Sequence, residues 1–139
     1  MTKREQNRVK RKRSLEANGW GLRSEERDAV KAHTSNETLP HYHLKAEVAR
    51  QANNAKSTVF SEVSNGQGIA DILLLRENTQ PLALVVEIET EVATERTKEK
   101  RETFMGSMIQ EVLVWDPTKA PTDLGDMQEW VSVKLDGFL

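Results

Sequence analysis

Two stretches near the start of the chain carry helix end signals. Residues 4–17 fit a helix that stops at Asn18, because the glycine after it allows a left-handed C-cap. Residues 24–33 begin with a serine and two glutamates, which are typical of an N-cap and first turn and predict a second, shorter helix. Residues 34–40 are loop-like. We therefore interpret residues 1–40 as an N-terminal extension and residues 41–139 as the main domain.

A third helix is expected from about residue 41 to residue 53. Leu44, Val48 and Ala52 recur every four residues and form a narrow apolar stripe. Glu47 lies about 60° from Leu44 around the helix axis, so it borders the buried face. A carboxylate there is either an ordinary edge residue or a group aimed at a site.

The pattern then changes from helical spacing to the apolar runs of strands. Near-continuous apolar runs are typical of strands covered on both faces, and they predict an α/β fold with a mixed central sheet flanked by helices. The expected elements are strands at 57–63, 69–75 and 82–89, a charged helix at 92–109, and strands at 111–115 and 130–135. Three tryptophans are expected to serve as packing residues rather than as platforms for bases: Trp20, Trp115 and Trp130.

The composition limits the class of protein. The 139 residues fit one domain, and 37% hydrophobic residues with a mean hydropathy of -0.65 describe a polar but foldable chain. The absence of cysteine excludes disulfides, cysteine-bound zinc and a cysteine nucleophile. No run approaches the roughly 18 apolar residues of a membrane span. We expect a soluble, cytoplasmic protein with no membrane partner.

Charge is distributed unevenly along the chain. Residues 3–13 contain seven Lys or Arg and one Glu, so this segment carries +6 while the net charge of the whole chain is -2. A basic segment on an acidic body fits phosphate contact by the segment and cation binding by the body, although a solvated tail is the alternative. The candidate DNA-binding residues are Lys3, Arg4, Arg8, Lys10, Arg11, Lys12 and Arg13.

Carboxylates interrupt two of the apolar strands. Asp71 is the one charged residue of IADILLL, residues 69–75, and such a charge is costly unless it reaches water, a partner or a metal ion. In the next strand Glu87, Glu89 and Glu91 share one face. The apolar first half of this strand is therefore followed by three carboxylates on one face.

A hairpin would bring these carboxylates together. If its turn centres on Thr79, Leu73 faces Val85 and Asp71 faces Glu87. Directly opposed residues have Cβ atoms roughly 4.5–5.5 Å apart, a distance at which two like charges repel. The arrangement makes sense if a divalent cation lies between them. A register one residue away would break it.

With these residues in place, the sequence resembles the PD-(D/E)xK, or restriction-endonuclease-like, nucleases. In that superfamily an Asp ends one strand and an acid-x-Lys motif lies on the next. Residues 68–73 (GIADIL) and 85–89 (VVEIE) stand in those places, and the resemblance covers about residues 41–116. It implies an αβββαβ core, here extended by a basic helical N-terminus.

The resemblance assigns roles residue by residue. It makes Asp71 and Glu87 metal ligands, and Glu47 stands at the place of the helix-borne acid. Glu89 occupies the Lys position, as it does in some restriction enzymes of the superfamily, where the Glu is thought to act on the attacking water; it is also a candidate ligand. The missing Lys can come from the following helix, with Lys98 and Lys100 as candidates.

Ordinary interpretations stand beside these roles. Asp71 and Glu87 could instead form a solvated sheet edge or pair with cations of the following helix. Glu62 either joins the site or faces solvent, and Lys45 is solvated unless it contacts phosphate. His41 and His43 are two residues apart near a helix start and cannot share one helix face, so structural or surface roles are expected.

The resemblance implies a Mg²⁺- or Mn²⁺-dependent DNA endonuclease that hydrolyses phosphodiester bonds of double-stranded or branched DNA. Small members of the superfamily include Holliday-junction resolvases, which act as dimers, so a homodimer is one alternative. A non-catalytic DNA-binding protein with a degenerate nuclease fold is the main rival. A protein-interaction module whose basic segment binds an acidic partner is a third.

Overall fold

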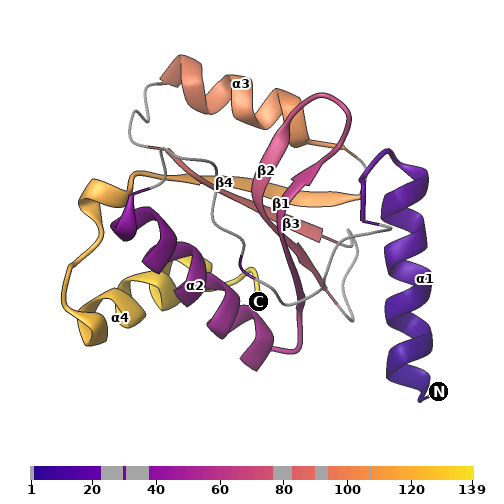
Figure 1. The fold of residues 1–139 in the computed structure, drawn as a ribbon, viewed down its shortest axis with the longest axis horizontal. Coiled ribbons are helices and arrows are strands. Elements are labelled where there is room, and N and C mark those ends of the chain that lie inside the picture. The colour runs from indigo at the N-terminus through magenta and orange to yellow at the C-terminus, as the bar shows by residue number, and fades with distance from the viewer. Residues whose placement is uncertain (1, 23–29, 31–37, 77–82, 90–93, 107) are drawn as a thin grey trace.

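A computed structural model describes the chain except for residues 1, 23–29, 31–37, 77–82, 90–93 and 107 (Figure 1). The described residues form an α/β fold. In chain order, its elements are α1 (Lys3–Ala17), α2 (Leu39–Asn54), β1 (Thr58–Ser64), β2 (Ile69–Leu75), β3 (Ala83–Ile88), α3 (Thr94–Phe104), β4 (Ile109–Trp115), the short 3-10 helix η1 (Pro117–Lys119) and α4 (Leu124–Leu135).

The four strands make one mixed sheet in the order β1-β2-β3-β4. β1, β2 and β3 are antiparallel neighbours, whereas β4 lies parallel to β3 after the crossover through α3. In the second hairpin Leu75 faces Ala83 and Leu73 faces Val85, which confirms the register expected from a turn centred on Thr79. The turn at residues 77–81 lies outside the described residues.

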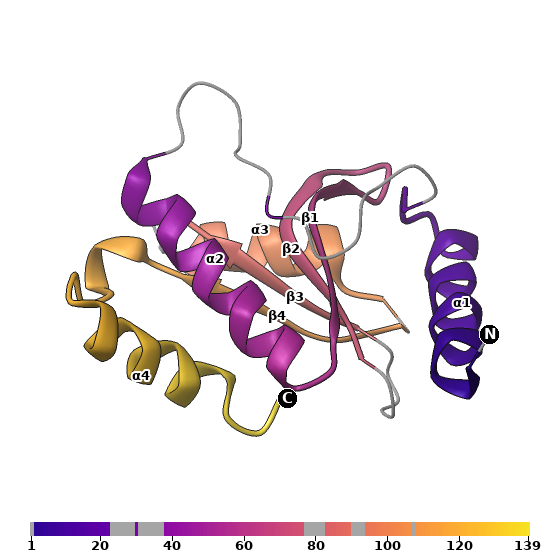
Figure 2. The ribbon, with the colours of Figure 1, turned by 60° about the horizontal axis from the view of Figure 1, so that its bottom comes forward.

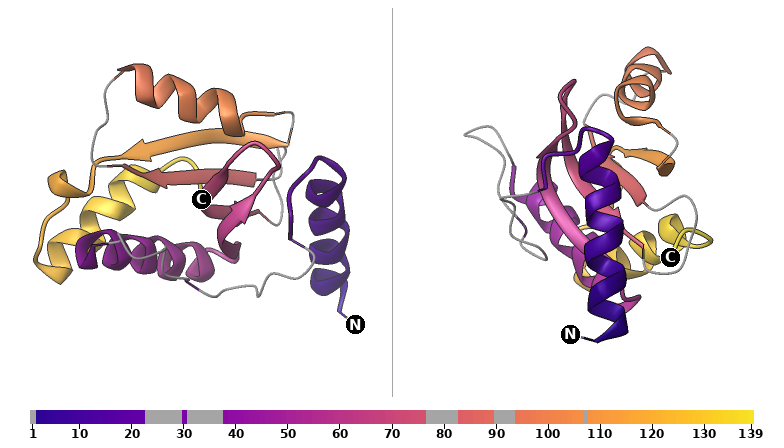
Figure 3. Two further views of the ribbon diagram at one scale, coloured as in Figure 1. Left: turned by 45° about the horizontal axis from the view of Figure 1, so that its top comes forward. Right: turned by 90° about the vertical axis from the view of Figure 1, so that its right-hand side faces the viewer.

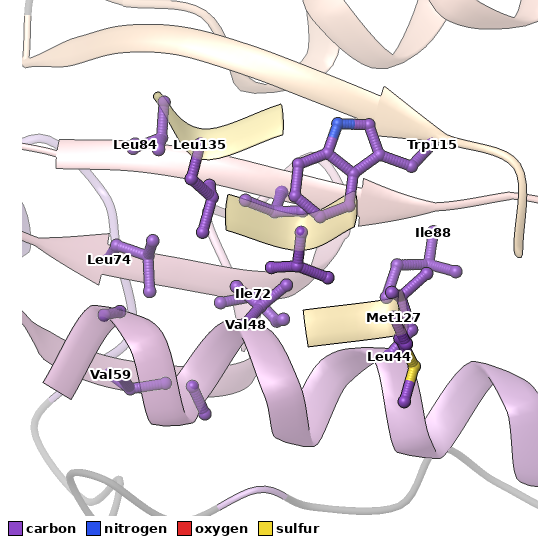
Figure 4. Packing of buried hydrophobic residues seen from close by; sticks show 14 residues of the cluster. Leu44, Val48, Val59, Ile72, Leu74, Leu84, Ile88, Trp115, Met127 and Leu135 are labelled. Atoms are coloured by element: carbon purple, nitrogen blue, oxygen red, sulfur yellow. The ribbon is translucent and has the colours of Figure 1, made fainter. Parts of the chain in front are cut away.

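Helices cover both faces of the sheet in three layers (Figures 1 and 3). α3 lies over one face, while α2 and α4 lie together under the other, and α1 stands beside the β1–β2 hairpin (Figure 2). Alternate strand residues point to the two sides, so Val85 packs toward α1 and α3 and Val86 toward α2 and α4. Figure 4 shows the α2–α4 side, where Val48, Ile72 and Trp115 interlock.

The basic N-terminal segment is helical, as expected, and it is docked on the sheet. Thr2 caps α1 through a capping box with Glu5. Leu15, Trp20 and Leu22 are buried in the same cluster as the sheet residues of the α3 face. The boundary expected after residue 40 stays a prediction, and the short helix expected at residues 24–33 lies almost wholly outside the described residues.

The strand expected at residues 130–135 is wrong, because these residues form the second half of α4. The Asp123 side chain caps the helix by accepting a hydrogen bond from the Asp126 N–H, and Met127, Val131 and Leu135 recur every four residues on its buried face. The apparent alternation of valines hid this helical spacing. No helix among the described residues is long and apolar enough to cross a membrane.

Two valines distinguish the helix from the strand by experiment. In a strand, residues 131 and 133 would share one face, but in α4 Val131 is fully buried and Val133 is 70% exposed. We expect Val131→Ala to lower the free energy of unfolding by about 2 kcal/mol. Val133→Ala should change it by less than about 0.5 kcal/mol. Urea denaturation checks this, and equal costs at the two positions would contradict the helix.

Candidate active site

Asp71 and Glu87 meet where β2 and β3 separate. Backbone pairing between the two strands ends at Ile72 and Val86. Beyond that point the Asp71 N–H donates a hydrogen bond of 2.8 Å to Glu87 Oε2, and the Ile88 N–H donates one of 2.7 Å to Asp71 Oδ2. Each of these peptide N–H groups therefore has a carboxylate oxygen as its acceptor, and the two acids hold each other in place.

In the β1–β2 hairpin, the alternation of side chains between the two faces of the sheet shifts by one residue beside Asp71. On β1, Phe60 and Val63 are three residues apart, yet both belong to the cluster on the α1–α3 side. On β2, Ala70 and Leu73 are also three residues apart and belong to the same cluster. Between Phe60 and Val63, Glu62 has a φ of 52°, a left-handed conformation that costs a residue with a side chain roughly 1–2 kcal/mol. Glu62 stands opposite Asp71, between the pairs Ser61–Ile72 and Val63–Ala70.

A lysine from α3 completes the site on one side. Lys100 Nζ lies 3.3 Å from Glu87 Oε1 and 3.9 Å from Glu89 Oε2. Glu87 is 1% exposed, whereas the side chains of Lys100 and Glu89 are each 24% exposed. The site is therefore buried at Glu87 and opens toward solvent at Glu89 and Lys100.

The two carboxyl groups have opposite pKa shifts. Burial, the charge of Asp71 and a hydrogen bond with Asp71 raise the pKa of Glu87 to about 8, against the smaller effects of the Asp71 N–H and Lys100. Burial also acts to raise the pKa of Asp71, but the nearby His41 ring and hydrogen bonds with Glu87 and the Ile88 N–H outweigh it and lower that pKa overall. These opposite shifts favour a proton on Glu87 rather than on Asp71 at neutral pH.

His41, from the first turn of α2, lies against the site from the other side of the sheet. Its Nε2 is 3.6 Å from Asp71 Oδ2, and both side chains are mostly buried. The spacing of His41 and His43 predicted a structural or surface role for both. The contact with Asp71 is long-range, and its one sequence signal was a histidine in the first turn of the helix before the motif strands.

Lys45 is fully buried, so the expectation that it is solvated is wrong. It lies one helical turn beyond His41, and its Nζ is 3.0 Å from Glu62 Oε1. Glu62, for which two alternatives were open, therefore faces this lysine next to Asp71, and its side chain is only 12% exposed.

Two other predicted residues lie apart from the carboxylate pair. Glu47 is buried, accepts hydrogen bonds of 2.7 and 2.9 Å from Arg50 Nε, and lines a cavity of about 540 Å³ between α2 and α4. Lys98 is exposed on α3. Of the two lysine candidates, Lys100 is the one that contacts the acids.

The donor set can hold a proton or a hard cation. Among the described residues, no group of three or more His, Cys, Asp or Glu side chains is already arranged as a metal site. Asp71 and Glu87 supply carboxylate oxygens, with Glu89 next along the chain. Mg²⁺ and Mn²⁺ favour such oxygen ligands and keep several waters, so one or two protein carboxylates suffice.

The basic residues of α1 divide into two groups. Lys3, Arg4, Lys10 and Arg13 are exposed. The other three predicted DNA-binding residues pack partly against the hairpin: Arg8, Arg11 and Lys12.

Comparison of the sequence with models of protein families gave no match, and comparisons with curated proteins and with solved structures gave none either.

The shifted pKa of Glu87 predicts how stability depends on pH. The pKa of Glu87 is raised from its ordinary value of 4.5 to about 8, so between these two pH values Glu87 binds a proton in the folded protein that it releases in the unfolded chain. The free energy of unfolding therefore falls as pH rises through this window, by at most about 1.4 kcal/mol per pH unit. Glu87→Gln should lose most of this slope in urea denaturations from pH 5 to pH 8.

Glu129→Gln, on the exposed face of α4, is the matched control and should keep the slope. An identical slope in Glu87→Gln and wild type would show that the proton is held elsewhere.

Proposed function

We propose that this protein is a divalent-metal-dependent DNA endonuclease with a restriction-endonuclease-like core. The observation that carries the proposal is the reciprocal pairing of Asp71 and Glu87 at the point where two strands separate, with Lys100 beside them. The order of α2, β1, β2, β3, α3 and β4 is compatible with the αβββαβ arrangement that the motif implies.

The electrostatics of the pair support a cation there. Two carboxyl groups in a mostly buried place repel, and Glu87 relieves the repulsion by keeping a proton up to a pH of about 8. A divalent cation would relieve it in the same way, which makes the donors fit Mg²⁺ or Mn²⁺. When bound, such a cation supplies a more acidic water and offsets negative charge on phosphate oxygens.

The chain's own residues then have distinct tasks. Lys100 Nζ, already beside Glu87 and Glu89, is placed to hold a phosphate oxygen and to balance its growing charge. Glu89 is the most exposed of the three acids Asp71, Glu87 and Glu89. Its carboxylate would accept the proton of the attacking water. His41 keeps Asp71 ionised through its contact at Oδ2.

DNA as the substrate is supported by α1. Its exposed cations form a basic surface on a helix that is anchored to the domain, since Arg11 Nη1 donates a hydrogen bond of 2.8 Å to the Arg76 carbonyl. Arg76 follows β2 five residues after Asp71, roughly 16 Å along the strand. α1 is therefore suited to hold phosphates a few nucleotides from the scissile bond.

A non-catalytic DNA-binding protein is the second candidate. Two observations favour it: Glu89 stands where the motif has Lys, and Lys100 Nζ is taken up by contacts with Glu87 and Glu89. Metal binding and DNA binding without cleavage would support it.

Cleavage of supercoiled, linear and four-way-junction DNA tests the proposal. Wild type should cut with Mg²⁺ or Mn²⁺ and not with EDTA. Asp71→Asn should lower the rate by at least about 100-fold, because it removes a cation ligand while keeping the shape. Absence of cutting by folded wild type that binds DNA would favour the second candidate.

Two lysines on α3 form a matched pair for the same assay. Lys100→Met should lower the rate by about 100-fold, since it removes the cation beside the acids. Lys98→Met removes an equal charge from the exposed face and should change the rate by less than about threefold. Equal effects would assign the loss to general electrostatics.

The basic surface of α1 is tested by binding rather than cutting. Lys10→Gln with Arg13→Gln should weaken DNA binding and lower the slope of log K against log salt by about 2, one unit per phosphate contact. The charge-matched control is Lys119→Gln with Lys134→Gln, two exposed lysines outside α1. Fluorescence anisotropy at several salt concentrations gives both slopes, and equal slopes would exclude α1 from the interface.

A further inference from the structure

Two neighbouring contacts join α2 to the kinked hairpin. His41 and Lys45 are four residues apart, so they lie on one face of α2, one turn from each other. His41 contacts Asp71 and Lys45 contacts Glu62, at 3.6 and 3.0 Å. Asp71 and Glu62 in turn stand opposite each other on β2 and β1. The four side chains therefore form two parallel connections between one helix face and one strand pair.

Two features of the Lys45–Glu62 ion pair lower the stability that it could contribute to the fold. Lys45 is 0% exposed and Glu62 nearly buried, and a buried ion pair often contributes less stability than well-packed apolar residues. Glu62 also holds a left-handed backbone, which residues with side chains rarely adopt. Two costs at one residue beside the candidate active site are typical of a functional constraint.

The left-handed backbone has a geometric consequence. A regular strand would direct Glu62 to the same side as Phe60, toward α1 and α3. The change of phase directs it to α2, where it contacts Lys45, and directs Val63 to the α1–α3 cluster instead. The kink that directs Glu62 to Lys45 therefore lies at the one position between Ser61–Ile72 and Val63–Ala70 where β1 and β2 are not paired, which is the position of Glu62 and Asp71.

We propose that Lys45 and Glu62 are a positioning pair for the active site, an inference that rests on the proposed function. The pair fixes the first turns of α2 on the hairpin kink, so that His41 lies against Asp71 and the Asp71 carboxylate stays directed at Glu87. Lys45 acts through its partners, because a fully buried ammonium bound to Glu62 has no path to a phosphate.

Three variants separate positioning from stability. Lys45→Met keeps most of the side-chain volume and removes the charge. Glu62→Asn removes the charge with a residue that tolerates left-handed backbone. Each single variant leaves one buried charge without its partner and should unfold at lower urea concentration. The double variant, Lys45→Met with Glu62→Asn, has neither charge and should regain most of the wild-type urea midpoint.

Binding of Mn²⁺ and the NMR signals of the His41 ring then decide the role. We expect the double variant to bind Mn²⁺ at least about tenfold more weakly than wild type and to show shifted His41 ring signals, despite its restored stability. Recovery of Mn²⁺ affinity to within about twofold of wild type, together with unshifted ring signals, would reduce the pair to a structural role and overturn the inference.

Wild type in the same titration distinguishes the two proposals. If wild type binds no Mn²⁺, the proposed function fails, and the His41 signals alone then decide the positioning role. Ring signals of the double variant that superimpose on those of wild type overturn the positioning pair, and shifted signals support it.

Discussion

The candidate site depends on two peptide N–H groups that donate to side-chain carboxylates just beyond the end of the β2–β3 pairing. Asp71 donates its N–H to the Glu87 carboxylate, and Ile88 donates its N–H to the Asp71 carboxylate. Buried peptide groups need such partners, so these two hydrogen bonds fix the two acids beside each other. Burial of Glu87, together with the charge of Asp71 beside it, raises the pKa of Glu87 and favours a proton there.

The rest of the fold brings nitrogen-bearing side chains to this pair from both faces of the sheet. α3 provides Lys100 and α2 provides the His41 ring, while Lys45 pairs with Glu62, which stands opposite Asp71 on the hairpin. Each helix is held by an apolar cluster on its own face, so the polar contacts add orientation to a packing that already exists. A site built in this way is buried at Glu87 and reaches solvent at Glu89 and Lys100.

Periodicity and turn chemistry predict much of this architecture. The pairing of Leu73 with Val85 follows from a short turn between two apolar runs, and it brings Asp71 near Glu87. Prediction fails where a strand and a helix fit the same sequence pattern. The alternation of Val131 and Val133 is typical of a strand, but both residues lie in α4. The backbone of Glu62 and the contact of His41 depend on a kink that no local signal encodes.

The most direct test of the central claim is calorimetric titration of Mn²⁺ into the metal-free protein at neutral pH, in buffers of different ionisation enthalpy. If Asp71 and Glu87 hold a proton where a cation belongs, wild type binds Mn²⁺ and releases close to one proton, and Asp71→Asn loses the binding. Binding by wild type without proton release, or equal binding by Asp71→Asn, would contradict the account.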